Sequence, residues 1–285
     1  MDQPQISFVV RERFGVGESP VWDADRQRLL WCDIPVGMIH ALDLASGARE
    51  SWNLGEPVPS LGLARHGRLV VALRNQVVLF DPQSGTREVV ASVTHAKPGM
   101  RLNDGKVGPD GAFWVGSMDA DGDAARLYRV APDGAVRTIA GGISISNGLA
   151  WNAAGTRLYH SDSRGGMWID CWDFDRSSGA VRNRRRLRDQ DLANGRPDGG
   201  ACDIADNYWS AGPSAGRINR LSPDGALLGW VDLPLLHPTM PCFGGPDMRT
   251  VFVTSLDSRS DDADRDGIVS FRVETPGVPV GRFGA

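Results

Sequence analysis

The sequence repeats a short apolar motif six times, and this repetition constrains the fold more than any other feature. Segments that favour β-strands recur at intervals of about 40 to 50 residues, centred on Trp31, Val70, Trp114, Tyr159, Trp209 and Phe252. Most are flanked by Gly-, Asp- or Asn-containing turns and followed by a second short strand. Repeats of this length are typical of propeller blades, because small antiparallel sheets bury both faces when they close into a ring. The sequence therefore predicts an all-β, six-bladed β-propeller, with residues 1–285 as a single domain.

A second segment precedes each of these motifs by 10 to 13 residues and is predicted to form the innermost strand of a blade. Aligning these segments places six residues at equivalent positions at one end of the central channel: Glu18, Ser60, Asn103, Asn147, Asp198 and Cys242. Taken singly, Asn, Asp and Glu near turns commonly bond their own backbone. Because four of the six positions carry a carboxylate or amide oxygen, we expect these four to form one ring.

This ring has the donor chemistry of a site for a hard metal ion. Carboxylates and amides without sulfur or imidazole suit Ca²⁺, Mg²⁺ or Mn²⁺. Glu18, Asn147 and Asp198 supply three ligands, which leaves positions open for water and substrate, as in catalytic sites. The four cysteines form no CxxC pair and the five histidines no HxH or HExxH pattern, so neither a zinc motif nor a disulfide framework is indicated.

The overall charge favours neither a nucleic acid nor a membrane as partner. The formal net charge is -4, with both signs well mixed. The basic run 182–189 is expected to lie on an outer blade edge, where charge discourages strand pairing. The first residues show no signal peptide and no segment has the length of a membrane span, so we expect a cytoplasmic protein with a small-molecule partner. A closed propeller needs no partner chain, so we expect a monomer.

Five motifs, in order along almost the whole chain, resemble the gluconolactonase/regucalcin (senescence marker protein) family: GESPVWD, RLNDGKVGPDGAFWVGSM, SNGLAW, RPDGGACD and PCFGGPD. The resemblance implies a six-bladed propeller in which Glu18, Asn147 and Asp198 coordinate one divalent metal. It implies that Arg101 and Asn103 bind the hydroxyls of a sugar lactone. Asp198 is similar to a residue that serves as both ligand and general base, and the implied reaction is hydrolysis of an aldonolactone to the aldonic acid. Because the family tolerates many ions, we expect Ca²⁺ first, with Mg²⁺, Mn²⁺, Zn²⁺ and Fe²⁺ as alternatives.

Two loops depart from the resemblance. Residues 119–130 form a short segment without the substrate-contacting Glu that a longer loop often supplies in the family, so the far end of the substrate is expected to be read differently. Residues 262–267, in the Asp-rich loop 257–267, match the first half of an EF-hand calcium loop. The twelfth position holds Val273 instead of Glu and no helices flank the loop, so we interpret it as a surface loop.

Two other functions fit the same scaffold. One is a hydrolase of other esters or of organophosphates, and the other is a non-catalytic, calcium-binding propeller whose metal is structural. Arg101 and Asn103 favour a polyol over an apolar substrate, because both present hydrogen-bonding groups suited to hydroxyls. The sequence therefore favours a metal-dependent sugar lactonase.

Overall fold

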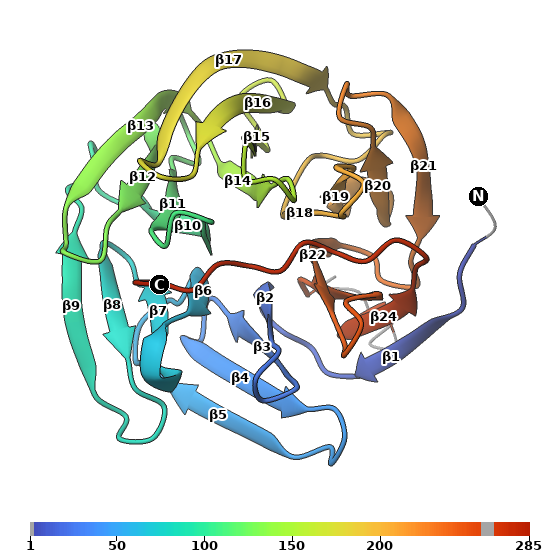
Figure 1. Ribbon diagram of the computed structural model, residues 1–285, viewed down its shortest axis with the longest axis horizontal. Helices are drawn as coiled ribbons and strands as arrows, with labels where there is room; N and C mark the ends of the chain where they lie inside the picture. Colours follow the sequence, from blue (N-terminus) through green and yellow to red (C-terminus); the bar gives the residue numbers. More distant parts are fainter. Residues whose placement is uncertain (1–2, 258–264) are drawn as a thin grey trace.

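The computed structural model describes residues 3–257 and 265–285, and within them six four-stranded antiparallel sheets are arranged in a ring around a central channel (Figure 1). This confirms the six-bladed β-propeller predicted from the repeats. Short 3₁₀ turns such as η1 (Arg65–Gly67) and η2 (Pro213–Ala215) lie between strands. No helix in the described residues has the length and apolar character needed to cross a membrane.

The first three blades follow the chain from the innermost to the outermost strand. Their strands are β2 (Gly17–Asp23), β3 (Arg28–Asp33), β4 (Met38–Asp43) and β5 (Arg49–Asn53) in blade 1; β6 (Ser60–Leu63), β7 (Leu69–Ala72), β8 (Gln76–Phe80) and β9 (Arg87–Ser92) in blade 2; and β10 (Arg101–Val107), β11 (Phe113–Met118), β12 (Ala125–Val130) and β13 (Val136–Ile143) in blade 3.

Blades 4 and 5 repeat this order, whereas blade 6 combines the two ends of the chain. The strands are β14 (Ser146–Trp151), β15 (Arg157–Asp162), β16 (Trp168–Asp175) and β17 (Ala180–Asp189) in blade 4; β18 (Gly200–Cys202), β19 (Tyr208–Gly212), β20 (Arg217–Leu221) and β21 (Leu227–Asp232) in blade 5; and β22 (Pro238–Gly244), β23 (Thr250–Ser255), β24 (Ile268–Arg272) and β1 (Ile6–Val10) in blade 6.

The ring closes through strand pairing between β1 and β24. The two strands are antiparallel, with Ile6 opposite Phe271 and Phe8 opposite Val269. β1 therefore completes the sheet that β22 to β24 begin, and blade 6 packs against blade 1 on its other side (Figure 1). Each blade keeps an inner edge strand, but these edges face the centre of the ring, where they are protected from pairing with other chains.

The core lies between neighbouring blades. Trp31, Trp114 and Trp209, three of the residues that mark the repeats, have at most 2% of their surface exposed. Tyr159 of blade 4 stacks on Tyr208 of blade 5 with ring centroids 4.8 Å apart. Such aromatic contacts bury large apolar areas and hold adjacent sheets at a fixed angle.

The basic run 182–189 lies on β17, the outermost strand of blade 4, as expected. Nε of Arg184 and Nε of Arg186 both contact the buried Asp170 carboxylate of β16, at 2.7 and 2.6 Å. Arg184 also lies over the ring of Trp168. These arginines therefore bind the outer strand to its neighbour within the blade.

Candidate functional site at one mouth of the channel

Four sequence-predicted residues lie at corresponding ends of the inner strands. Glu18 is the second residue of β2, Asn103 the third of β10 and Asn147 the second of β14, while Asp198 lies two residues before β18. Their exposed fractions are 7%, 8%, 5% and 7%. The four are thus nearly buried, and they are brought to one mouth of the channel from four blades.

Irregular strand pairing accompanies these residues. The register with the next strand shifts between Glu18 and Val21 in blade 1 and between Asn147 and Ala150 in blade 4. The residue that follows the polar side chain has positive φ in both cases, 51° at Ser19 and 73° at Gly148. Bulges of this kind re-aim a side chain. They explain how a polar side chain can be presented from a strand that is otherwise buried.

Asp198 is fixed by two backbone hydrogen bonds, one to blade 5 and one to blade 6, in the irregular segment before β18. Its N–H donates to Ala211 O over 3.1 Å, and the next N–H, of Gly199, donates to Thr239 O over 2.9 Å. A Cβ atom on Gly199 would lie 2.3 Å from Cγ of Met240. Glycine is therefore required beside Asp198 because blade 6 approaches the backbone of blade 5 too closely for a side chain.

A chain of hydrogen bonds orients the two asparagines. Nη1 of Arg101 donates to Oδ1 of Asn103 over 2.8 Å. Nδ2 of Asn103 donates to Oδ1 of Asn147 over 2.9 Å and to Ser146 O over 3.0 Å. The amide oxygen of Asn147 is thereby directed by a donor on one lone pair and keeps its second lone pair for another partner.

Ser163 continues this chain and was not identified from the sequence. Nδ2 of Asn147 donates to Oγ of Ser163, and Oγ of Ser163 donates to Pro197 O, each over 2.6 Å. Ser163 follows β15 and joins blade 4 to the segment that carries Asp198. The sequence predicts this role of Ser163 only weakly, because the contact depends on how the turn after β15 packs against residues 190–197.

Burial and neighbouring carboxylates raise the pKa of both carboxyl groups of the site. Burial raises the pKa of Glu18 well above its usual range, and the charges of Asp198 and Asp104 raise it further. Burial also raises the pKa of Asp198 to about 7, which Asp104 increases and Arg196 opposes. Two nearby carboxylates that desolvation and repulsion both destabilise are stabilised by a cation between them.

Asp104 is a third carboxyl group of the channel and was also missed. It follows Asn103 within the irregular stretch of β10, where the register shifts between Leu102 and Gly105. Burial raises its pKa, whereas Lys106 and backbone N–H groups lower it. One oxygen accepts from Leu149 N over 3.2 Å, and the other is buried without a hydrogen-bond partner.

The donor set fits a hard divalent cation. Among the described residues, no group of three His, Cys, Asp or Glu side chains is placed to hold a metal. A metal at this mouth would therefore need the amide oxygen of Asn147 in addition to Glu18 and Asp198. Two carboxylates, one amide oxygen and open positions match oxygen-binding ions such as Ca²⁺.

The predicted alignment of the innermost strand of blade 6 was wrong. Cys242 lies four residues after the start of β22, well beyond the mouth, and Thr239 is the residue that follows Pro238 as Glu18 follows Gly17. Thr239 Oγ1 donates to Gly17 O over 2.6 Å, so it binds blade 6 to blade 1. In blade 2, Ser60 is the first residue of β6, and its Oγ donates to Asn103 O over 2.8 Å.

The short segment 119–130 comprises a turn and then β12. Asp119 Oδ2 pairs with Nζ of Lys97 at 2.5 Å and accepts from Ala124 N over 3.1 Å. The turn is therefore tied to the loop that precedes β10. In the Asp-rich 257–267 loop, Asp262 and Asp264 lie outside the described residues, while Asp266 is buried and pairs with Arg13 at 3.3 Å.

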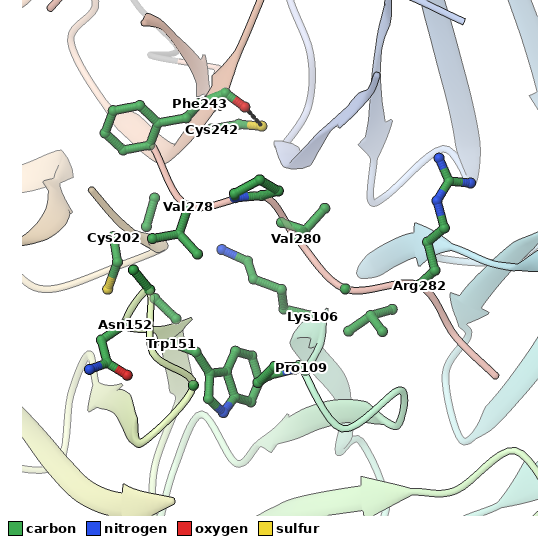
Figure 2. Close-up of a pocket in the computed structure, with 18 of the residues that line it drawn as sticks. Lys106, Pro109, Trp151, Asn152, Cys202, Cys242, Phe243, Val278, Val280 and Arg282 are labelled. Carbon is green, nitrogen blue, oxygen red and sulfur yellow. Dashed lines mark hydrogen bonds between the residues drawn. The ribbon is translucent and has the colours of Figure 1, made fainter. Parts of the chain in front are cut away.

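A pocket of about 400 Å³ lies farther along the inner strands, at the opposite mouth. The C-terminal segment, red in Figure 1, crosses this part of the ring, and Figure 2 shows its Val278, Val280 and Arg282 around Lys106. Nζ of Lys106 donates to Gly200 O over 2.5 Å. None of the five predicted site residues lines this pocket, so it is separate from the candidate site.

The fold and the site define a class, that of six-bladed propellers with a buried oxygen-donor site at one mouth of the channel. Residues 16–257 match the model of the SMP-30/Gluconolactonase/LRE-like region. The chain belongs to this family, which confirms the resemblance seen in the five motifs.

Similar proteins include named lactonases and a calcium-binding protein. The chain is 38% identical over 253 residues to a 6-deoxy-6-sulfogluconolactonase of Pseudomonas putida, covering 88% of this chain and 86% of the relative. It is 30% identical to the pentonolactonase XacC of Haloferax volcanii, covering 92% and 89%. The crystal structure of a calcium-binding protein, regucalcin, from Agrobacterium tumefaciens has a TM-score of 0.93 at 26% identity, covering 99% and 98%. Lactonases are carboxylic-ester hydrolases, so these relatives agree with the enzyme class predicted from the sequence.

Proposed function

We propose that this protein hydrolyses a sugar lactone to the aldonic acid, with one divalent metal held by Glu18, Asn147 and Asp198. The observation that carries the proposal is the pairing of two buried carboxyl groups with the directed amide oxygen of Asn147. Relatives named for sulfogluconolactone and pentonolactone hydrolysis support the lactone as substrate class. The calcium-binding regucalcin supports a divalent cation, with Ca²⁺ as the first candidate.

The metal would act as a Lewis acid on the ester carbonyl, which stabilises negative charge as water attacks. Asp198 has the second task of orienting the attacking water and accepting its proton. A raised pKa improves a carboxylate as a base, whereas coordination of the same group weakens it. The proposal therefore depends mainly on Asp198 as a metal ligand, because coordination would make the same carboxylate a weaker base.

Arg101 and Asn103 bind the hydroxyl groups of the sugar in this proposal. The Arg101 guanidinium is largely buried, and its Nη1 is held by Leu102 O and Asn103 Oδ1, each at 2.8 Å. A guanidinium fixed in this way presents its remaining N–H groups in a constant direction. Ordered donors at the mouth favour a polyol over the aryl esters and organophosphates considered as alternatives.

The test is proton release during hydrolysis of five- and six-membered aldonolactones by chelated enzyme, with single divalent ions added back. We expect little turnover without metal and restored turnover with at least one of Ca²⁺, Mg²⁺ and Mn²⁺. Absence of turnover on every lactone, with calorimetry showing the metal bound, would reject the proposal in favour of a structural metal. Full turnover in the chelated enzyme would reject the metal-dependent mechanism.

A further inference from the structure

A shallow hollow of about 470 Å³, lined by both polar and apolar residues, lies beside the start of β10, on the same face as the candidate site. It is bounded by Arg74 and Asn75, from the turn between β7 and β8, and by the loop 93–100. That loop leads directly into Arg101. The hollow is therefore next to the part of the mouth where we place the sugar hydroxyls.

The backbone of Arg74 is held firmly at this edge. Its carbonyl oxygen accepts from Leu102 N over 2.8 Å and contacts Nε2 of His95 at 3.0 Å. These bonds fix the start of the Arg74 side chain against β10 and against the loop 93–100. A cation attached to a fixed backbone loses less entropy on binding a ligand than one on a free loop.

Arg74 supplies the unpaired positive charge of the hollow. Lys97 also lines it, but Nζ of Lys97 is paired with the Asp119 carboxylate at 2.5 Å. Across the described ranges 3–257 and 265–285, no carboxylate lies within ion-pair distance of the Arg74 guanidinium, and its side chain is exposed. A guanidinium without a carboxylate partner is available to bind an anionic ligand.

The charge of Arg74 reaches the site itself. Burial lowers the pKa of Arg101 to about 10, the Glu18 carboxylate opposes this lowering, and the like charge of Arg74 adds to it. The two guanidinium groups are therefore close enough to repel. A ligand anion between them would relieve that repulsion.

Two guanidinium groups act on the part of the mouth beside the hollow, those of Arg101 and Arg74. The carboxylate that acts on Arg101 is Glu18, which we assign to the metal. With Glu18 bound to a cation, both guanidinium groups would be available to an anionic substrate.

The shape of the ring leaves room on the Arg74 side. Blade 2 places the small Ser60 where the neighbouring blades place Glu18 and Asn103. A substrate held at the metal by its ester group can therefore extend over blade 2. The hollow and Arg74 lie at the end of that blade.

We propose that Arg74 determines specificity by binding an anionic group on the carbon of the lactone farthest from its carbonyl. This inference rests on the lactonase function proposed above and narrows its substrate class to aldonolactones that carry a sulfonate, carboxylate or phosphate at that end. The three groups share the planar or tetrahedral oxygen arrangement that a guanidinium binds with paired hydrogen bonds.

The experiment compares Arg74→Gln and Arg74→Lys with the unmodified enzyme, each loaded with Ca²⁺. The substrates are D-glucono-1,5-lactone, its 6-deoxy-6-sulfo and 6-phospho derivatives, and a lactone of D-glucaric acid. We expect Arg74→Gln to lower kcat/KM for at least one anionic lactone by roughly 10-fold, mainly through KM, with the neutral lactone changed less than about 2-fold. Arg74→Lys should retain part of the preference, and rising ionic strength should weaken anionic substrates selectively.

Arg68→Gln is the matched control, because Arg68 belongs to the same blade, lies at the opposite end of β7 and pairs with Glu88. It should leave the ratio of anionic to neutral turnover unchanged. An equal loss on neutral and anionic lactones in Arg74→Gln, or no loss on any anionic lactone, would overturn the inference while leaving lactonase function intact. If no lactone is hydrolysed, calorimetry with 6-deoxy-6-sulfogluconate and gluconate still tests the inference. Equal affinity of the unmodified protein and Arg74→Gln for 6-deoxy-6-sulfogluconate would overturn it.

Discussion

The side-chain amide of Asn103 donates to Oδ1 of Asn147 over 2.9 Å and so joins blade 3 to blade 4 at the mouth of the channel. Asn103 thereby orients the amide oxygen of Asn147. Because Arg101 donates to the opposite end of the Asn103 amide, the group has a donor on one side and an acceptor on the other. The residue placed with the substrate and the residue placed with the metal are coupled through this single amide.

Asn103→Ala should weaken substrate use more than metal binding. The variant removes the acceptor of Arg101 and one donor to Asn147, whose other bond to Ser163 remains. We expect KM for the lactone to rise by roughly 10-fold, with Ca²⁺ affinity changed several-fold at most. Asn103→Asp is the informative partner, since it keeps an acceptor for Arg101 but removes the donor. A larger loss of Ca²⁺ binding than of substrate binding in Asn103→Ala would contradict this division of roles.

Asp198→Ala should lose both metal binding and turnover, and Asp198→Asn should do the same with less change in volume. Charge count strongly affects the affinity of oxygen sites, so we expect Ca²⁺ binding to fall at least ~100-fold. In the absence of metal, Asp198→Asn should be no less stable than the unmodified protein, because the substitution relieves repulsion at Glu18. Calorimetric titration, proton release and chemical denaturation measure the three quantities, and an active Asp198→Ala enzyme would refute the assignment.

Ser163→Ala should affect metal binding although Ser163 is not proposed to contact the metal. The substitution leaves the buried Nδ2 of Asn147 without its 2.6 Å acceptor, at a cost of about 1–3 kcal/mol. We expect lower stability and several-fold weaker Ca²⁺ binding, measured by denaturation and titration. Ser177→Ala, in an exposed turn, is the control and should change neither. Unchanged Ca²⁺ affinity in Ser163→Ala would show that Asn147 does not need this support.

Gly199→Ala should destabilise the fold beside Asp198. The new methyl group would lie 2.3 and 2.4 Å from Cγ and Cβ of Met240, so backbone or side chain must move, at a cost of typically 1–3 kcal/mol. Gly141→Ala is the comparison, since the nearest atom to a Cβ there is 3.9 Å away. Denaturant unfolding measures the free energy of unfolding of both variants. Equal values would mean that blade 6 adjusts to the new methyl group without loss of stability.

Removal of the metal should lower stability as well as activity. A ligand that binds the folded state alone stabilises it by about 2.7 kcal/mol at a free concentration 100 times its Kd. We therefore expect Tm to rise with Ca²⁺ concentration in the unmodified protein and to stay constant in Asp198→Ala. Differential scanning calorimetry over a range of Ca²⁺ concentrations checks this, and a calcium-independent Tm would argue against a site in the folded ring.

The architecture was predictable because propeller repeats place a large apolar residue at each anchor. The position of each polar residue was predictable to within a residue or two where a Gly-containing turn or bulge follows it, as at Asn147. Blade 6 has no glycine beside its polar residue, since Met240 follows Thr239, and the alignment there placed Cys242 at the mouth instead of Thr239. The inner strands of blades 1, 4 and 6 are all buried along their length, so without a glycine no alternation marks the register.

The rest of the site depends on contacts between distant segments. Asp104 was overlooked because adjacent strand residues normally face opposite sides, and only the irregular pairing of β10 brings both it and Asn103 into the interior. Ser163 and Arg74 act across blade boundaries, through turns whose meeting points no local pattern specifies. Sequence periodicity predicts the blades, but these neighbours follow from the angle at which the blades pack.

The β1–β24 pairing would give a cation bound at this mouth an additional role. Glu18 belongs to the first complete blade and Asp198 to the fifth, so a chain still being synthesised has one carboxylate long before the other and no site at all. The two carboxylates are held at the same mouth only after β1 has paired with β24. An ion bound at the mouth would then link early and late parts of the chain, and its release would be coupled to the opening of the ring.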